Sequence, residues 1–393
     1  MAIVVQKYGG SSVADVERMH LVADRVAALR RTGTNVVVVV SAMGDTTDDL
    51  LALARKISEN PARRELDMLL TAGERMSMAL LSMALNERGV PAVSFTGSQS
   101  GIITNDAHTS ARIVEVRPYR IQDELARGRV VIVAGYQGVS YRKEITTLGR
   151  GGSDTTAVAL AAALDAEACE IYSDVAGIFT ADPRVVSAAR RLSEISYEEM
   201  QELAEHGAKV LNAQAVEFAK DRGIAIYARA TSGEAGETVV RKFPPRGPGR
   251  VVGIASESGL VLLSSRDERP EALLELFDEL EAGGKEFLYR AGPPAQTSLV
   301  LSLENLPDFA RLKARIHERF GAAVALREGV GAVSAIGAGI NASYRNLRTA
   351  LVVAAGMDAC VLGVSTSSFR VSLLLDEIHL PEAVQKLHAR LVG

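Results

Sequence analysis

Residues 3–13 read IVVQKYGGSSV, and this stretch decides the fold class. Its β-branched start predicts a strand, its two glycines predict a tight turn, and the pattern from Val13 to Arg31 predicts a helix. Further strands are expected at 36–40, 92–95, 130–134, 168–172 and 224–227, and further helices at 48–58, 72–88, 110–125, 155–164, 197–206 and 213–221. Because several of these strands are apolar on both faces, the sequence predicts an α/β domain with a largely parallel sheet covered by helices.

A linker follows this domain. Residues 242–250 contain three prolines and two glycines, a composition typical of linkers. Two βαββαβ units of the ferredoxin-like kind come next. The first has expected strands at 260–263, 286–289, 298–303 and 322–326 with helices at 270–282 and 308–320, and the second has strands at 332–335, 360–364 and 369–375 with helices at 344–355 and 381–391. The second unit is one strand short, and we expect the spare strand at 251–255 to complete it.

The composition excludes several kinds of protein. With 44 Lys+Arg against 48 Asp+Glu, the net charge of -4 does not favour a nucleic-acid partner. Cys169 and Cys360 stand far apart in apolar surroundings, and the six histidines lack paired spacing, so we expect no protein-held metal or redox site. The longest apolar run, Ala157 to Leu164, is too short for a membrane helix, and the residues before Lys7 do not resemble a signal peptide. We therefore expect a cytoplasmic protein with no membrane contact.

The first turn has the features of an anion site. Gly9 and Gly10 allow the backbone to approach an anion closely, the following helix offers free N–H groups, and Lys7 adds a cation. A plain tight turn is the alternative interpretation. The stretch is not a Walker A sequence, because the lysine precedes the glycines.

A second glycine turn, at residues 146–156, reads TTLGRGGSDTT and also opens an apolar helix. Helix capping accounts for one or two of Ser153, Asp154 and the threonines. It does not account for Arg150, whose planar guanidinium suits a carboxylate when it stands between glycines. Two such turns in one α/β domain favour a phosphoryl-transfer site over two coincidental loops.

Six segments, in this order, resemble the signatures of aspartate kinases. They are KYGGSSV at 7–13, SAMGDTTD at 41–48, LTAGER at 70–75, FTGSQ at 95–99, the turn around Arg150, and YSDVAGIFTADPR at 172–184. The resemblance extends from residue 1 to about residue 225, and the two C-terminal units resemble the paired ACT domains of that family. It implies a three-layer amino-acid-kinase sandwich at 1–240, a linker at 241–250, a first ACT unit at 251–330 and a second at 331–393.

The resemblance also implies a role for each matching residue. Lys7, Gly9, Gly10 and Ser11 would hold the phosphates of ATP, with Lys209 reaching them and Asp154 orienting Lys7. Aspartate would be bound by Ser41, Thr47, Glu74, Arg150, Gly151, Gly152 and Ser153, with Arg150 on its α-carboxylate and Glu74 near its ammonium group. The nucleotide would be lined by Ser173, Asp174, Phe179, Asp182 and Arg184. For Glu74 and Thr47, an ordinary surface position on a helix is the alternative.

These roles make chemical sense. The acceptor carboxylate is already ionised at neutral pH, so no strong general base is needed. The difficulty is to bring an anion against a polyanion, and Lys7, Arg150, Lys209 and Mg²⁺ would supply the compensating charge. The expected reaction moves the γ-phosphoryl group of ATP to the β-carboxylate of L-aspartate, the first step toward lysine, threonine and methionine. Two alternatives stay open: a kinase for glutamate, acetylglutamate, carbamate or UMP, and a catalytically silent amino-acid sensor.

The ACT units predict partners as well. Their exposed sheet edges favour a homodimer or higher oligomer, and the resemblance implies lysine or threonine as an effector. Relatives carry Asp-Lys-Pro-Gly in the first unit, where this chain has DERPE at 267–271, with Glu271 in the place of the glycine. Residues 290–291 and 339–343 depart from the effector contacts of relatives too. Because a carboxylate repels the effector's own, we expect weak inhibition or none, with the ACT pair serving mainly for dimerisation. The alternative is a shifted binding mode that keeps feedback intact.

Overall fold

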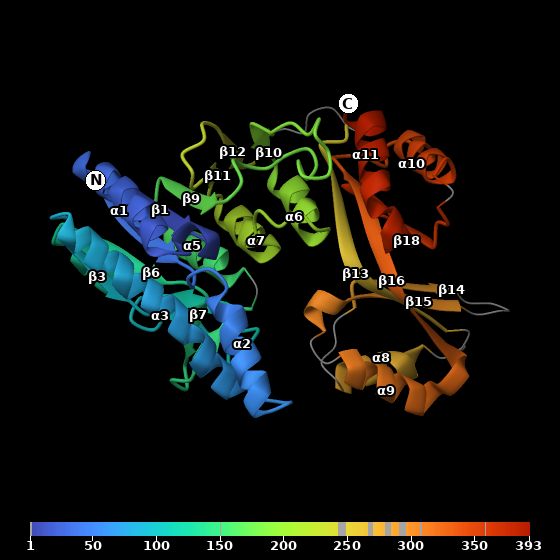
Figure 1. The fold of residues 1–393 in the computed structure, drawn as a ribbon, viewed down its shortest axis with the longest axis horizontal. Helices are drawn as coiled ribbons and strands as arrows, with labels where there is room; N and C mark the ends of the chain where they lie inside the picture. The colour runs from blue at the N-terminus through green and yellow to red at the C-terminus, as the bar shows by residue number, and fades with distance from the viewer. Residues whose placement is uncertain are drawn as a thin grey trace. The chain divides into compact units, whose positions relative to one another are not determined.

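The computed structural model describes residues 2–149, 151–242, 249–265, 270–279, 284–290, 296–306, 309–357 and 359–393. Arg150, residues 243–248 of the expected linker and residues 267–269 of the DERPE segment lie outside the described residues. The chain forms two compact units, drawn in Figure 1. The first contains Met1–Phe179, Arg191–Glu205 and Lys209–Pro245, and the second contains Thr180–Arg190, His206–Ala208 and Arg246–Gly393.

The first unit is built on an eight-stranded sheet with the order β10-β12-β11-β9-β1-β2-β6-β3. Its strands are β1 (Ile3–Tyr8), β2 (Asn35–Val40), β3 (Ala92–Phe95), β6 (Val130–Ala134), β9 (Ala168–Ser173), β10 (Glu194–Ile195), β11 (Ile226–Ala230) and β12 (Glu237–Val240). All neighbouring pairs are parallel except β11 and β12. The largely parallel sheet expected from the sequence is therefore confirmed.

Helices cover both faces of this sheet. They are α1 (Val16–Arg31), α2 (Thr46–Ile57), α3 (Arg63–Glu87), α4 (Tyr119–Ala126), α5 (Gly152–Ala163), α6 (Tyr197–Glu205) and α7 (Ala213–Arg222). Side chains alternate between the faces of β1: Tyr8 belongs to a buried cluster with residues of α1 and α3, whereas Lys7 contacts Asp154 of α5. The sheet thus lies between two helical layers.

A small four-stranded sheet was missed by the sequence analysis. It has the order β5-β4-β7-β8, with β4 (Ile102–Thr104), β5 (Ile113–Val116), β7 (Gln137–Ser140) and β8 (Ile145–Thr147). The helix expected at 110–125 is wrong in its first half, which forms β5, and helix begins only after Pro118. Strand β8 leads directly into the second glycine turn, so this small sheet supports the expected substrate site.

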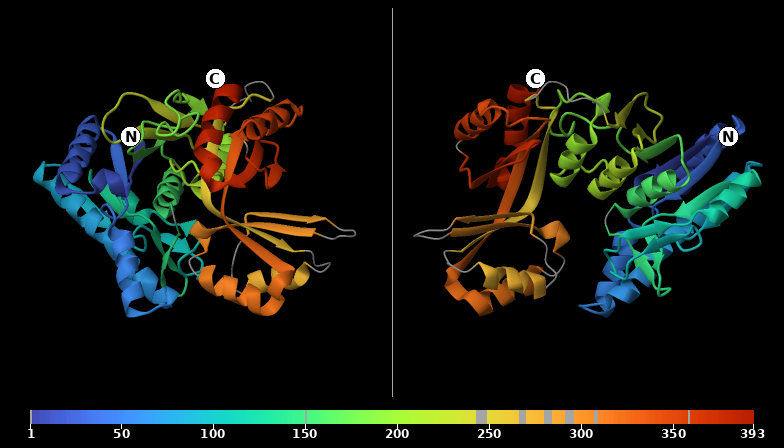
Figure 2. Two further views of the ribbon diagram at one scale, coloured as in Figure 1. Left: turned by 45° about the vertical axis from the view of Figure 1, so that its right-hand side comes forward. Right: turned by 180° about the vertical axis from the view of Figure 1, so that it is seen from behind.

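The second unit has one antiparallel sheet with the order β14-β15-β13-β16-β18-β17. Its elements are β13 (Gly253–Ser265), α8 (Glu271–Glu279), β14 (Glu286–Arg290), β15 (Gln296–Ser302), α9 (Phe309–Phe320), β16 (Val324–Ile336), α10 (Arg345–Ala355), β17 (Gly363–Thr366), β18 (Arg370–Asp376) and α11 (Leu380–Leu391). Strands β13 and β16 run side by side (Figure 2) and are long enough to serve both ferredoxin-like modules. The start of β13, where the spare strand was expected, pairs with the end of β16: Gly253 faces Ile336.

Residues 180–190 lie between parts of the first unit in the sequence but belong to the second unit in the structure. Residues 180–190 contribute Ala181 and Val186 to a buried cluster with Ile254, Val384 and other residues of the second unit. The unit boundaries therefore differ from a single cut at residue 240. None of the helices formed by the described residues combines the length and apolar character that crossing a bilayer requires.

Candidate active site

The two glycine turns meet at the carboxyl ends of adjacent parallel strands, where α/β proteins bind their ligands. The residue after β2, Ser41, donates its backbone N–H to the carbonyl of Tyr8 at 3.1 Å, and Gly9 donates to the carbonyl of Tyr172 at 3.3 Å. The ends of β1, β2 and β9 are therefore joined by hydrogen bonds. Ser11 lies in the short 3-10 helix after β1, Gly10–Val13, and Ser173 is the last residue of β9.

An ion pair lies at the centre of this edge. Lys7 Nζ lies 2.7 Å from Asp154 Oδ1, and the two side chains are only 13% and 8% exposed. Asp154 Oδ2 also accepts a hydrogen bond from the backbone N–H of Asn212 at 3.2 Å. Asp154 therefore holds a nearly buried ammonium group in place at the first glycine turn. It serves this pair and not the cap of α5, whose N-cap residue is Gly151.

Close backbone packing explains why glycines occupy both turns. A Cβ atom on Gly10 would lie 2.9 Å from the carbonyl oxygen of Ala42. Gly151 adopts φ +70°, and a Cβ there would lie 2.4 Å from the side chain of Asn212. The N-terminus of α5 has no side-chain cap, and with Gly152 and Ser153 in its first turn it presents a positive dipole end beside Lys7.

Glu74 is a buried acid and not a surface residue. It lies in the middle of α3 and is 3% exposed. Burial raises its pKa to about 7, opposed by backbone hydrogen bonds from Glu74 itself and from Ala42. Its Oε2 atom has no hydrogen-bond partner among the residues that the structure describes. A buried, incompletely bonded carboxyl group suits a cationic ligand group.

Helix α3 approaches the first turn closely. A Cβ on Gly73 would lie 2.8 Å from the Cβ of Ala42, and the segment after Ala42 returns to Gly10 through the hydrogen bond from Gly44 N–H at 3.1 Å. Thr47 is the second residue of helix α2, which follows this segment and begins at Thr46, and it is half-buried. The structure therefore joins Glu74, Ser41 and the first glycine turn through one continuous set of backbone contacts.

The remaining expected nucleotide residues are placed differently. Asp174 is exposed just after β9, and Lys209 is exposed on the loop that leads to Asn212. The backbone of Phe179 forms an isolated β-bridge with that of Arg191 within the first unit. Asp182 and Arg184 pair with each other at 2.7 Å in the segment that packs into the second unit. Their contact with a nucleotide stays a prediction, as does the role of Arg150, which lies outside the described residues.

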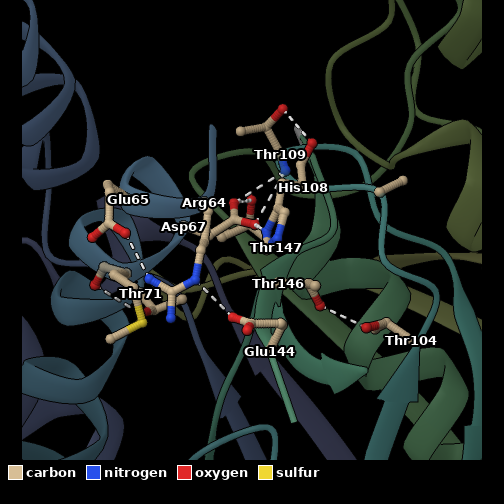
Figure 3. A network of polar contacts seen from close by, with 12 residues as sticks. Arg64, Glu65, Asp67, Thr71, Thr104, His108, Thr109, Glu144, Thr146 and Thr147 are labelled. Carbon is tan, nitrogen blue, oxygen red and sulfur yellow. Dashed lines mark hydrogen bonds and ion pairs between the residues drawn. The ribbon is translucent and has the colours of Figure 1, made fainter. Parts of the chain in front are cut away.

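A buried carboxylate near the site, that of Asp67, was not predicted from the sequence (Figure 3). Asp67 is fully buried on α3, and it receives hydrogen bonds from Thr147 Oγ1 at 2.6 Å and from the backbone of Thr109 at 3.1 Å. His108 Nδ1 lies 2.6 Å from its other oxygen. The spacing of Asp67, Thr71 and Glu74 along one helical face was the available signal.

Comparisons with known proteins agree with this geometry. Residues 2–228 match the model of the amino acid kinase family. The aspartokinase of Mycolicibacterium smegmatis is 44% identical, and the match covers 99% of this chain and 96% of that protein. Escherichia coli aspartokinase III in complex with aspartate and ADP (R-state) superposes with a TM-score of 0.86 at 26% identity, with both chains covered in full. Its complex with lysine and aspartate (T-state) gives 0.76 at 27% identity, again with full coverage.

A covered parallel sheet with two glycine turns and a buried lysine–aspartate pair at its carboxyl edge defines a phosphoryl-transfer enzyme of the α/β class. The comparisons make that class specific. The chain belongs to the amino acid kinase family and, within it, to the aspartokinases.

Proposed function

We propose that the protein transfers the γ-phosphoryl group of ATP to the β-carboxylate of L-aspartate and forms 4-phospho-L-aspartate, at the start of the route to lysine, threonine and methionine. The observation that carries the proposal is the Lys7–Asp154 pair, held at 2.7 Å beside two glycine turns. A buried Glu74 on the neighbouring helix supplies a partner for an amino group. The related Escherichia coli enzyme is known with aspartate and ADP.

In this mechanism the protein positions two anions and compensates their charge. Lys7 would contact the phosphates together with the backbone of Gly9, Gly10 and Ser11. Asp154 would keep the Lys7 ammonium group aimed at them. Ser173, Asp174, Phe179, Asp182, Arg184 and Lys209 would complete the nucleotide contacts.

Aspartate would be held at both ends, so that its β-carboxylate faces the γ-phosphate. Glu74 would accept from the ammonium group and Arg150 would bind the α-carboxylate with its planar fork. Ser41, Thr47 and the turn at 151–153 would surround the substrate. Because the nucleophile is already ionised, the site needs orientation more than a base.

Magnesium would enter with the nucleotide. The carboxylate beside Lys7 is that of Asp154, and its oxygens are already bonded to Lys7 and to the Asn212 backbone. Mg²⁺ usually keeps several waters and is held through substrate phosphates with only one or two carboxylates, so this donor set fits MgATP and not a metal held by the protein alone. The ion would neutralise charge on the phosphates.

The regulatory half would form a separate module. We propose that residues 251–330 and 331–393 form two ACT units after a catalytic domain at 1–240 and a linker at 241–250, and that they pair into a homodimer or higher oligomer. Any effector that they bind would be lysine or threonine, acting weakly. The two ferredoxin-like modules of the second unit, and the relative known with lysine, support this assignment.

The test is a hydroxylamine trap, which converts an acyl phosphate into a coloured hydroxamate. We expect MgATP-dependent hydroxamate from L-aspartate and far less from L-glutamate, since a 1 Å misplacement of a reacting group costs roughly 10²-fold. Acetylglutamate, carbamate and UMP complete the panel. Equal turnover of aspartate and glutamate, or turnover of none of the panel, would overturn the proposal.

A further inference from the structure

We propose that Asp67, with Thr147 and His108, is a positioning cluster that fixes the span between Glu74 and the glycine turn at 151–153 and so makes the site selective for aspartate over longer homologues. The inference rests on the proposed function, because it assigns one end of the substrate to Glu74 and the other to that turn. These three residues do not touch the substrate. They act through the elements that do.

The cluster is buried and well bonded. Asp67 is 0% exposed. Its Oδ1 accepts from the Thr147 hydroxyl at 2.6 Å and from the backbone N–H of Thr109 at 3.1 Å, and its Oδ2 lies 2.6 Å from His108 Nδ1. One hydrogen bond therefore joins the His108 ring to the second oxygen of Asp67. Buried networks with every member bonded are stiff, so the cluster joins its elements tightly.

The cluster connects the two ends of the proposed aspartate site. On α3, Asp67 and Glu74 are seven residues apart, two turns along one face of a continuous helix. On the other side, Thr147 is the last residue of β8, and Arg150 follows three residues later. A movement of α3 against β8 would therefore change the distance between Glu74, the ammonium partner, and the turn at 151–153, which begins four residues after β8. The Thr147–Asp67 hydrogen bond opposes that movement.

Other contacts between these elements are weaker. Arg64 pairs with Glu144 at 2.8 Å, but the side chains are 50% and 38% exposed, and exposed pairs contribute little. Gln137 of β7 reaches Thr71 and Arg75 of α3 with longer bonds of 3.3 and 3.4 Å. Among the described contacts between α3 and the small sheet, the Asp67 cluster has the shortest bonds of buried groups.

Selectivity for aspartate over glutamate follows from the fixed position of α3 relative to β8. Aspartate and glutamate share an ammonium group and an α-carboxylate, and they differ by one methylene in the arm that carries the nucleophile. With both shared groups held at a set distance, only the shorter arm places its carboxylate against the γ-phosphate. If α3 could shift, the site would accommodate the longer arm at the expense of aspartate.

Neighbouring threonines provide a matched pair of variants. Thr147→Val removes the hydroxyl that bonds Asp67. Thr104→Val removes an equally buried hydroxyl that bonds Thr146 at 2.6 Å, but only between strands of the small sheet. Both variants replace a buried hydroxyl with a methyl group, and each leaves the former partner, Asp67 or Thr146, without that hydrogen bond.

We expect Thr147→Val to raise KM for aspartate about tenfold, to leave KM for ATP within about twofold, and to lower the preference for aspartate over glutamate. Thr104→Val should keep all three values near wild type, and Thr147→Ser, which restores the hydroxyl, should recover them. Should Thr147→Val fail to fold, His108→Gln at the more exposed end of the cluster should shift the same preference in the same direction.

The proposal is overturned if Thr147→Val and Thr104→Val behave alike, or if Thr147→Val, or His108→Gln in its place, leaves the ratio of aspartate to glutamate turnover unchanged. Failure of the proposed function has a different signature, because the wild-type protein would then form no hydroxamate from aspartate at all.

Discussion

Replacing the buried Glu74 with glutamine should stabilise the protein while it impairs aspartate use. Without substrate, Glu74 has no cationic partner among the described residues, and burial raises its pKa from 4.5 to about 7. That difference corresponds to ~3 kcal/mol of unfavourable free energy for the ionised form. Glutamine has nearly the same shape and carries no charge, so Glu74→Gln removes this cost.

The raised pKa of Glu74 makes the free energy of unfolding depend on pH. The folded state holds the Glu74 proton more tightly than the unfolded chain does, so this group lowers the free energy of unfolding as pH rises from 4.5 toward 7, and the loss is complete above about 7. Relative to wild type, Glu74→Gln should therefore gain less than about 1 kcal/mol at pH 5 and about 3 kcal/mol at pH 8. Urea unfolding at the two pH values measures the difference.

The assay pairs this stability measurement with kinetics. KM for aspartate should rise in Glu74→Gln, while KM for ATP should not change, because the ammonium group loses its charged partner. Glu124→Gln is the control: its carboxylate already pairs with Arg127 and Arg129 at 2.5 and 2.9 Å, so the substitution should give no gain in stability. A Glu74→Gln protein that is less stable at pH 8, or that keeps its KM for aspartate, would refute the reasoning.

Three further predictions concern the phosphate cradle, the effector and the assembly. Lys7→Ala should lower kcat about a hundredfold or more, because its charge matters most in the transition state; near-normal kcat in steady-state assays would contradict the cradle. We expect weak inhibition or none when lysine and threonine are titrated, alone and together, into the aspartate assay. Strong inhibition at sub-millimolar concentration would contradict this prediction. Light scattering at micromolar concentration should give at least a dimer, and a monomer would count against ACT pairing.

Sequence patterns predicted the large elements well and the small ones poorly. The strands at 92–95 and 130–134 have the expected bounds. The second of them is buried at every residue and shows as a continuous apolar run, as a strand covered on both faces should. Strands β4, β7 and β8 are three or four residues long, too short to show a period. The apolar residues of β5 were read as part of a helix, since a short apolar run fits either period.

The site residues also divide into those that the sequence could predict and those that it could not. The glycine turns and Lys7 could be recognised locally, because their chemistry is contained in a few consecutive residues. The contact of Lys7 with Asp154 joins residues far apart in sequence, and only the resemblance suggested it. The burial of Glu74 and the role of Asp67 depend on how α3 packs, which no local pattern specifies. The spacing of polar residues along α3 is also compatible with an exposed helix. The contact of α3 with the small sheet, which buries some of these residues, could not be predicted from the sequence.

The segment at 180–190 has a consequence for synthesis on the ribosome. Thr180 Oγ1 lies 2.8 Å from His388 Nε2, the carbonyl of Val185 accepts from Gln385, and Arg190 donates to the carbonyl of Val392. These partners are translated about 200 residues later, at 5–20 residues per second. The burial of Ala181 and Val186 can therefore be completed only when the last residues of the chain have been made, tens of seconds after residues 180–190.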